Sequence, residues 1–288
     1  MASPVLIEEI PIDRNAEAHP EMRVDALSMP ARVTLLGVEL DCFTPDELIG
    51  HLVAASHAGI GGYVMTPNVD HLRLISRDPG LRERVTHASV RVADGMPLLW
   101  ASRLQGTPLP ARVAGSDLTG KLAAALAEAD RTLYLLGGAP GTADRAAEIL
   151  RQSNQGLRIV GTSCPPYGYD RDPQASAALL DAVVKEQPDF VYLGLPLEKS
   201  SALAMQLRES LPRTWFLGLG ISLSFIAGDV TRAPRWMQIV GLEWLHRLWQ
   251  EPKRLTKRYL LDDLPFAFRL FGSALLHRAR GINDETAA

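Results

Sequence analysis

The sequence predicts an α/β fold in which a parallel sheet is flanked by helices and followed by a C-terminal helical appendage. Short apolar runs alternate with segments of helical periodicity from residue 33 to about residue 220. Such alternation is typical of a parallel sheet with helices on both faces. After Gly220 the alternation stops, and tryptophan and basic residues become frequent. We therefore expect one large core and a smaller terminal unit of different character.

The predicted elements follow in chain order. Residues 33–40 predict one or two strands around Gly37. The sequence Thr44-Pro-Asp-Glu47 predicts the start of a helix that ends near Gly59, because Thr is a good N-cap and Pro suits the first helical position. Further strands are expected at residues 63–65, 90–92, 132–136, 157–160, 190–193 and 214–217. Further helices are expected through residues 71–75, from Asp78-Pro79, after Gly95, at 142–150, at 173–186 and up to about residue 210.

The loops that follow these strands hold most of the candidate functional residues. In open α/β sheets ligands bind at the C-terminal ends of the strands, where the loops of neighbouring strands meet. We therefore expect one site to combine the loop positions Thr66, Asn68, Asp94, Gly137, Gly194 and Gly218.

Composition limits the functional classes. The 288 residues are 47% hydrophobic and 22% charged with a net charge of −3, which argues against a generic nucleic-acid binder. Two cysteines without a CxxC motif or a Cys/His cluster fit a reducing compartment and argue against structural zinc. We see no signal peptide and no run of about 18 apolar residues, so we expect no membrane span.

Charge divides the chain into three expected parts. Residues 1–29 hold six acidic residues and two arginines and are predicted to be a disordered leader. Residues 30–230 form the predicted α/β core. Residues 231–288 form a basic, Trp-rich helical appendage, with ten Lys or Arg against four acids between residues 232 and 280. This basic end indicates an anionic partner, either a phosphate group or a membrane surface.

Asp94 is the first candidate for chemistry. It ends the strand around Val90 and Val92 and precedes a helical pattern that begins at Met96. A carboxylate at this edge can take a proton from a substrate hydroxyl group. The alternative is that Asp94 only caps the following helix, a common role for Asp.

Two further features indicate a phosphate ligand. Gly137-Gly-Ala-Pro-Gly141 lies between a strand and a helix, where glycines allow close approach of an anion to a helix N-terminus. An ordinary tight turn explains this loop equally well, and the loop only loosely matches a dinucleotide fingerprint. In the appendage, Arg247 and Arg254 are seven residues apart and would share a helix face if the turn near Pro252 permits, with Lys257 close by. They could clamp a diphosphate or simply form a solvated basic face.

Several sequence blocks occur in a fixed order. They are Thr66-Pro-Asn-Val-Asp-His71, Ala93-Asp-Gly-Met-Pro97, Arg112-Val-Ala-Gly-Ser-Asp117, Leu136-Gly-Gly-Ala-Pro-Gly141, Arg232-Ala-Pro-Arg-Trp236, Gly241-Leu-Glu-Trp-Leu-His-Arg247 and Glu251-Pro-Lys-Arg254. With these blocks the chain, from about residue 33 to residue 259, resembles the WecG/TagA/CpsF glycosyltransferase family of bacterial enzymes.

The resemblance implies a Rossmann-like core and an inverting, metal-independent transferase without cofactor. The expected donor is a UDP-sugar with an N-acetylmannosamine-, mannosaminuronate- or glucose-like sugar. The expected acceptor is a sugar on a polyprenyl diphosphate, in cell-surface polysaccharide or teichoic acid assembly at the inner face of the plasma membrane. The resemblance implies catalytic roles for Asp94, as general base, and for Thr66 and Asn68. It implies substrate or nucleotide binding by Gly137, Gly138, Gly194, Glu198, Ser224, Arg232, Arg247, Arg254 and Lys257, with Arg258 as an alternative to Lys257.

This chain departs from the family pattern at three positions. The family usually has Pro-Lys-Gln-Glu where this chain has Pro196-Leu-Glu-Lys199, so Leu197 replaces the Lys and Glu198 takes the Gln position. Ser224 stands where the family usually has Asp before Phe. Because a carboxylate cannot donate a hydrogen bond as an amide does, the identity of the nucleotide-sugar donor stays open. Three other functions also stay open: a non-catalytic nucleotide-sugar-binding scaffold, a membrane-surface interaction protein and a Rossmann-type oxidoreductase that uses NAD.

Overall fold

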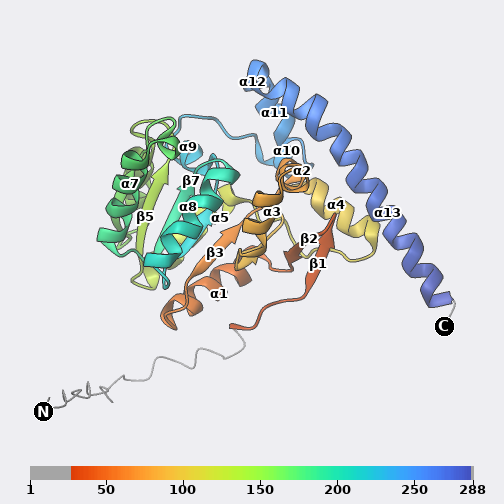
Figure 1. Ribbon diagram of the computed structural model, residues 1–288, viewed down its shortest axis with the longest axis horizontal. Helices are drawn as coiled ribbons and strands as arrows, with labels where there is room; N and C mark the ends of the chain where they lie inside the picture. The colour runs from red at the N-terminus through yellow and green to blue at the C-terminus, as the bar shows by residue number, and fades with distance from the viewer. Residues whose placement is uncertain (1–26, 287–288) are drawn as a thin grey trace, which may run out of the picture.

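The computed structural model describes residues 27–286, and the side chains of residues 27–281. Its centre is a six-stranded sheet with the strand order β4-β3-β8-β7-β5-β6. Figure 1 shows this sheet with helices packed around it. The strands are β3 (Gly62–Met65), β4 (Val90–Arg91), β5 (Thr132–Gly137), β6 (Arg158–Ser163), β7 (Phe190–Gly194) and β8 (Trp215–Gly218). Every neighbouring pair runs parallel, which confirms the α/β prediction.

Helices cover both faces of this sheet because its side chains alternate between two apolar cores. Tyr63 and Met65 point into one core and Val64 into the other. On the Val64 side lie α1 (Pro45–His57), α5 (Gly115–Glu128), α6 (Thr142–Ser153) and α9 (Ser222–Ile226). On the opposite side lie α2 (Val69–Arg77), α3 (Pro79–Thr86), α7 (Pro173–Glu186) and α8 (Leu197–Ser210), and the short turn η2 (Tyr169–Arg171) precedes α7.

Residues 32–41 form two strands, which resolves the alternatives left open by the sequence. β1 (Arg32–Leu35) and β2 (Val38–Asp41) form a separate antiparallel hairpin. Leu36 and Gly37 both have positive φ angles at its turn, 49° and 79°, as a two-residue hairpin turn requires. The hairpin is joined to the central sheet through Asp41, whose buried carboxylate accepts a hydrogen bond of 2.8 Å from the Arg91 backbone.

Two strands differ in length from the prediction. β4 is only two residues long, and β6 extends through Ser163. The helix after β4, α4 (Met96–Gln105), begins with Gly95 as its N-cap, and Gly95 has a φ of 108°. Asp94 therefore does not cap this helix. The predicted disordered leader, residues 1–29, lies almost entirely outside the described residues.

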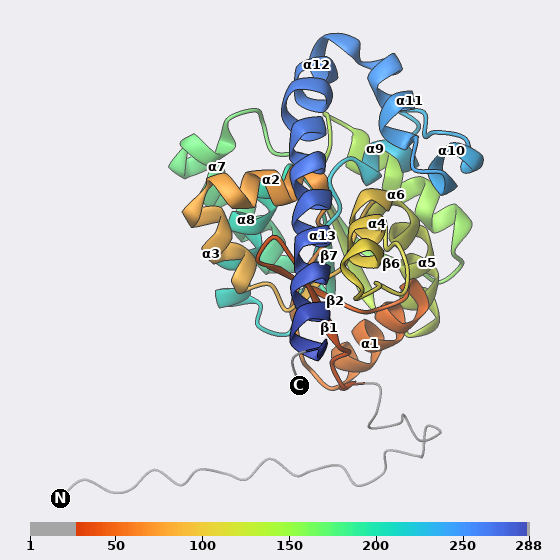
Figure 2. The same cartoon turned by 90° about the vertical axis from the view of Figure 1, so that its right-hand side faces the viewer.

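The C-terminal appendage is a chain of helices that folds back over the core. It comprises α10 (Arg235–Ile239), α11 (Glu243–Gln250), α12 (Pro252–Thr256), the π-helix η3 (Lys257–Asp263) and α13 (Leu264–Thr286). α13 runs along the molecule between α2 and α4 (Figure 2). It buries Phe266, Leu270 and Ala274, which lie on one helix face because they are four residues apart. Among the described residues, no helix combines the length and apolar character needed to cross a bilayer.

The condition under which Arg247 and Arg254 would share one helix face, a permissive turn near Pro252, is not met. The chain turns at Glu251, which has φ −129° and ψ 57°, and Pro252 then starts α12. Proline cannot continue a helix through its interior because it lacks the backbone N–H and clashes with the preceding turn. The two arginines consequently lie on two helices, α11 and α12.

Candidate active site

A large cavity lies where the C-terminal ends of the central strands meet the appendage. Its volume is about 860 Å³. Loops after β3, β4, β5, β7 and β8 line one side, and residues of α10–α11, α12, η3 and α13 line the other. Thr66, Asn68, Asp94, Gly138, Gly194, Gly218, Ser224, Arg247 and Arg254 all contribute to its wall. The expected convergence of the strand-end loops therefore holds, except at Gly137.

Asp94 presents an unpaired carboxylate to this cavity. Its backbone N–H donates to the Pro67 carbonyl at 2.8 Å, which fixes the loop after β4 next to the loop after β3. No described residue hydrogen-bonds to its carboxylate oxygens. Burial raises the pKa of this carboxyl group to about 7; Arg112 opposes the shift, and Glu243 and Asp117 add to it. A carboxyl group with a pKa near neutrality is suited to accept and release a proton.

Four charged side chains surround Asp94 and connect the core to the appendage. Arg112 donates to Asp117 at 2.8 Å and to Glu243 at 3.2 Å. Arg232 contacts the same two carboxylates, at 2.6 Å and 3.4 Å. Arg112 lines the cavity, whereas Arg232 lies behind its wall. Arg232 thus orders the acids that face Asp94, and Arg112 is a wall residue to which the sequence reasoning gave no role.

Thr66 and Asn68 line the cavity and also hold the loop after β3 in place. The Thr66 hydroxyl group donates to the Gly218 carbonyl at 3.3 Å, which links the ends of β3 and β8. The Asn68 side chain accepts a hydrogen bond of 3.0 Å from the His71 backbone and caps α2. Both residues therefore have a structural task beside any contact with a ligand.

The glycines of the loop after β5 have different tasks. Gly138 and Ala139 line the cavity, but Gly137 and Gly141 do not. A Cβ atom on Gly137 would lie 2.5 Å from the Gly194 carbonyl oxygen, so Gly137 permits close approach of β5 and β7. Gly137 therefore has a packing role in this structure, while Gly138 and Gly194 lie at the cavity.

The two departures after β7 lie in different surroundings. Leu197 lines the cavity beside Pro196 and Ser200, whereas Glu198 does not. The Glu198 backbone carbonyl accepts a hydrogen bond from Ser201 within α8, and its side chain is not part of the cavity wall. Glu198 therefore does not reach the cavity in this conformation, and an apolar side chain, Leu197, lines it where the family pattern has lysine. Ser224, the third departure, is at the cavity.

The appendage brings a cluster of cations to the cavity. Arg247 is largely buried, and its Nε atom has no hydrogen-bond partner among the described residues. Arg254 forms a bidentate pair with Glu251, at 2.6 Å and 2.9 Å, and Arg247 lies 3.9 Å from the same carboxylate. Lys257 is exposed and does not line the cavity, whereas Arg258 does. Of the two alternatives for the third cation, the structure therefore brings Arg258 to the cavity.

Sequence reasoning overlooked several wall residues besides Arg112. Asp70, His71, Trp244, Tyr259 and Asp263 line the cavity. Burial lowers the pKa of His71 to about 4, with Arg258 acting in the same direction against Asp70, so this imidazole is neutral at physiological pH. The block Thr66–His71 contains two of these residues, but only the fold shows that α2 presents them to the appendage.

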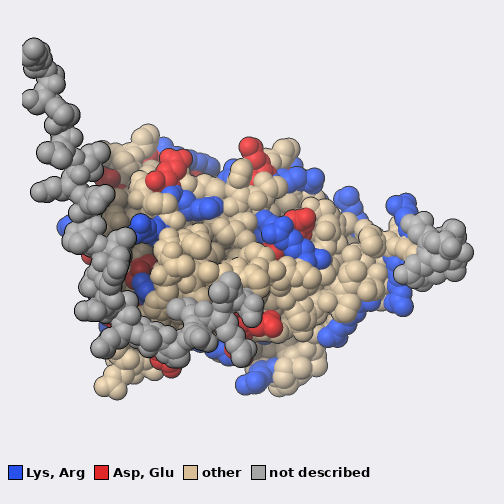
Figure 3. All heavy atoms as spheres, turned by 90° about the horizontal axis from the view of Figure 1, so that it is seen from below, with Lys and Arg blue, Asp and Glu red and all other residues tan. Residues whose placement is uncertain are grey.

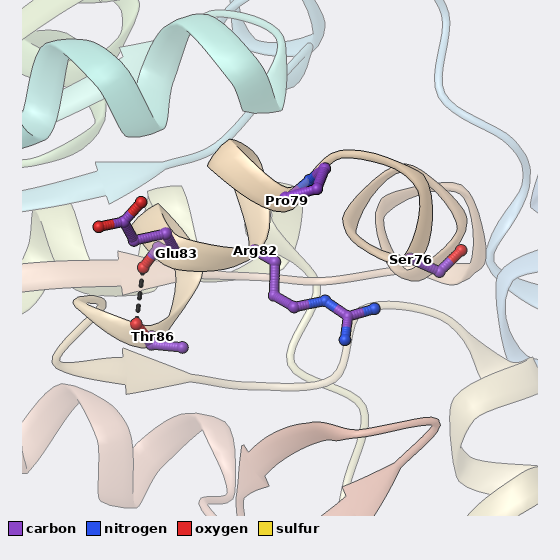
Figure 4. Close-up of a pocket in the computed structure, with 5 residues that line it drawn as sticks. All are labelled: Ser76, Pro79, Arg82, Glu83 and Thr86. Atoms are coloured by element: carbon purple, nitrogen blue, oxygen red, sulfur yellow. Dashed lines mark hydrogen bonds between the residues drawn. The ribbon is translucent and has the colours of Figure 1, made fainter.

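A second, smaller cavity of about 460 Å³ lies between α2 and α3 (Figure 4). It is lined by Ser76, Pro79, Arg82, Glu83 and Thr86. Its polar groups serve the local helices: Thr86 donates to the Glu83 carbonyl at 2.6 Å, and Arg82 donates to the Ile75 carbonyl at 3.4 Å. The larger cavity, with its carboxylate and cations, is therefore the candidate active site. Within the part of the chain that the structure describes, no group of three or more His, Cys, Asp or Glu could hold a metal ion.

The geometry agrees with a comparison against protein families. Residues 33–280 match the model of the glycosyl transferase WecG/TagA/CpsF family. The match covers the central sheet, the candidate active site and most of the appendage. The chain therefore belongs to the WecG/TagA/CpsF family of glycosyltransferases, which act in the assembly of cell-surface polysaccharides.

Proposed function

We propose that this protein transfers a sugar from a UDP-sugar to a sugar hydroxyl group on a polyprenyl-diphosphate carrier, with inversion and without a metal ion. The observation that carries the proposal is the unpaired Asp94 carboxylate, with a pKa near 7, in the same cavity as Arg247 and Arg254. A base for the acceptor and cations for the leaving group are the two needs of this reaction.

The proposed reaction is a single displacement. Asp94 takes the proton of the acceptor hydroxyl group as its oxygen attacks the anomeric carbon. The bond between that carbon and the UDP oxygen breaks, and its electron pair leaves with UDP. Attack opposite to the leaving group inverts the anomeric configuration. Product stereochemistry, read by NMR from the anomeric coupling, tests this part of the proposal.

Arg247 and Arg254 are proposed to stabilise the charge that builds up on the UDP diphosphate. Guanidinium groups bind phosphate oxygens through two parallel hydrogen bonds, and fixed cations in a cavity stabilise a developing anion strongly. The unpartnered Nε of Arg247 supports this role, because a buried donor without a partner costs free energy that a ligand oxygen would recover. Arg254 pairs with Glu251, so a diphosphate must displace the Glu251 carboxylate before it can form two hydrogen bonds with the Arg254 guanidinium group.

The sugar donor is proposed to be an N-acetylmannosamine-, mannosaminuronate- or glucose-like UDP-sugar. Leu197 gives the cavity an apolar surface near the loop after β7, and Ser224 supplies a hydroxyl group near α9. A panel of the three UDP-sugars in a UDP-release assay tests this choice.

We further propose that the appendage contacts the inner face of the plasma membrane. Trp236, Trp249, Leu261, Phe268 and Leu276 are each more than 60% exposed on it. Lys and Arg side chains surround the narrow end of the molecule at the right of Figure 3, towards which α13 runs in Figure 1. Exposed apolar side chains with basic neighbours are typical of helices that lie on anionic lipid.

A thermal-shift panel tests nucleotide binding directly. UDP and UDP-sugars are expected to raise the melting temperature without added metal, because ligands that bind the native state stabilise it, whereas NAD should not. Arg247→Ala should reduce this shift. Arg235→Ala serves as the matched control, since Arg235 is an exposed appendage arginine outside the cavity wall. A shift with NAD alone would instead favour the oxidoreductase alternative.

A further inference from the structure

Four charged side chains form a closed cluster between α2 and η3. Arg258 contacts Asp70 at 2.6 Å, Arg73 contacts Asp263 at 3.0 Å, and Arg73 also pairs with Asp70. The ring closes between Arg258 and Asp263 at 3.7 Å. The side chains of Asp70, Arg73 and Asp263 are only 8–12% exposed, and that of Arg258 is 33% exposed. Two residues come from the core and two from the appendage.

The π-helix makes this arrangement possible. Arg258 and Asp263 are five residues apart, and in an α-helix such residues point about 140° away from each other. In a π-helix the repeat is wider, with hydrogen bonds from residue i to residue i+5, so both side chains face the same way. Both can therefore meet α2, where Asp70 and Arg73 are three residues apart on one face.

The appendage does not need this cluster merely to stay packed on the core. α13 already buries Phe266, Leu270 and Ala274. Apolar contact holds a helix to a surface but specifies its rotation and register weakly, whereas buried ion pairs have strict geometric demands and are costly to misalign. The four ion pairs, formed by acidic and basic side chains that alternate around the cluster, therefore fix the position of η3 on α2.

We infer that Asp70, Arg73, Arg258 and Asp263 form an ionic latch that seats the appendage on the core and thereby positions Arg254 for the substrate. Arg254 lies four residues before Arg258, and the two are joined through α12 and the start of η3. This role rests on the proposed function of Arg254. It also assigns Arg258 a positioning task, because one terminal nitrogen of its guanidinium group pairs with Asp70 at 2.6 Å and its Nε atom lies 3.7 Å from Asp263. Like that of Arg247, the Nε atom of Arg258 has no hydrogen-bond partner among the described residues.

The chain offers a matched control between the same two elements. Arg77 of α2 approaches Asp262 of η3 at 3.8 Å, but these side chains are 61% and 31% exposed. Exposed pairs of this length contribute little because water screens them and both side chains keep their freedom. Arg77→Gln removes an α2–η3 ion pair without touching the latch.

Hydrogen–deuterium exchange of the ligand-free full chain is the primary test. Arg258→Gln is expected to raise exchange in residues 252–263 by about tenfold, because it leaves the Asp70 carboxylate with one partner fewer. Strands β5 and β7 should not change. Arg258→Lys should restore most of the protection, and Arg77→Gln should behave as wild type. Asp70→Asn combined with Arg258→Gln should raise exchange by less than the sum of the two single changes, since both substitutions remove the same Arg258–Asp70 pair and only Asp70→Asn also removes the Arg73–Asp70 pair.

UDP titration separates positioning from direct binding. A latch predicts that Arg258→Gln weakens UDP binding severalfold together with the faster exchange. Weaker UDP binding with unchanged exchange would show that Arg258 itself holds the ligand, and unchanged exchange in any case overturns the latch. If Arg258→Gln does not fold, Asp263→Asn provides the same comparison. If the wild-type protein shows no affinity for UDP but Arg258→Gln still raises exchange in residues 252–263, the proposed function is refuted and the latch is supported.

Discussion

Asp94→Asn should abolish transfer and at the same time stabilise the protein at alkaline pH. The cavity raises the pKa of Asp94 from 3.8 to about 7, chiefly by burial. The folded state therefore holds this proton more tightly than the unfolded state does. The stabilisation that results is complete below the unfolded pKa and is lost as the pH rises through about 7. Above that pH the charged carboxylate opposes folding, and Asn removes this cost.

The magnitude follows from the pKa shift. Roughly three pKa units at 1.36 kcal/mol each give about 4 kcal/mol as an upper bound. Asp94 borders a cavity that water can enter, so about half, or about 2 kcal/mol, is the better expectation. For a chain of 288 residues that corresponds to a rise in melting temperature of about 3 °C at about pH 8. The difference should shrink as the pH falls towards 4.

The assay compares melting curves and UDP release between about pH 4 and pH 8. Asp117→Asn gives the comparison of opposite sign, because burial raises the pKa of Asp117 but pairing with Arg232 and Arg112 outweighs it and lowers that pKa. That substitution should destabilise the protein at neutral pH, and the loss should fade in acid. Wild-type kcat/KM should rise through an apparent pKa near 7 as Asp94 loses its proton. If Asp94→Asn keeps normal turnover, or melts lower than wild type at pH 8, the assignment of Asp94 is wrong.

Two paired substitutions test the appendage and the loop after β5. Phe268→Glu should abolish sedimentation with anionic vesicles and leave the melting temperature unchanged, because Phe268 is 68% exposed; Phe266→Glu should instead cost several kcal/mol, since Phe266 is buried. Equal vesicle binding by wild type and Phe268→Glu would contradict the membrane proposal. Gly137→Ala should destabilise the protein by about 2 kcal/mol or more, because the new methyl group meets the Gly194 backbone at 2.5 Å. Gly272→Ala, where nothing lies within 4 Å, should stabilise α13 by about 0.5–1 kcal/mol. A melting temperature that is the same for both glycine variants would show that the β5–β7 approach can relax.

Local patterns predicted the core well because each one reflects short-range physics. Thr44 caps α1 as its side chain and the following Pro and Glu indicated. The strand ends at Thr66, Gly138, Gly194 and Gly218 meet at one edge, since the direction of parallel strands leaves no alternative. Asp94 was a candidate for the same reason. Only the structure shows that Asp94 does not cap the following helix, because Gly95 is the N-cap of α4.

The appendage shows where sequence patterns stop being informative. The spacing of Arg247 and Arg254 suggested one helix face, yet the turn at Glu251 and Pro252 places them on two helices that still reach one cavity. Lys257 and Arg258 are neighbours in the chain, and only the packing of η3 against α2 shows which of them reaches the cavity. The spacing of residues in the sequence does not predict a π-helix such as η3, which has more residues per turn than an α-helix.

The sequence by itself determined the alternation of strands and helices, the edge at which the site forms, the basic character of the appendage and the family. These depend on hydrophobic periodicity, turn residues and charge, which are properties of neighbouring residues. Only the tertiary structure decided that Glu198 and Lys257 leave the cavity, that Arg112 and Asp70 join it, and that burial brings the pKa of Asp94 near 7. Solvent exclusion and ion pairing between distant segments require all of the packed elements at once, so no local pattern encodes them.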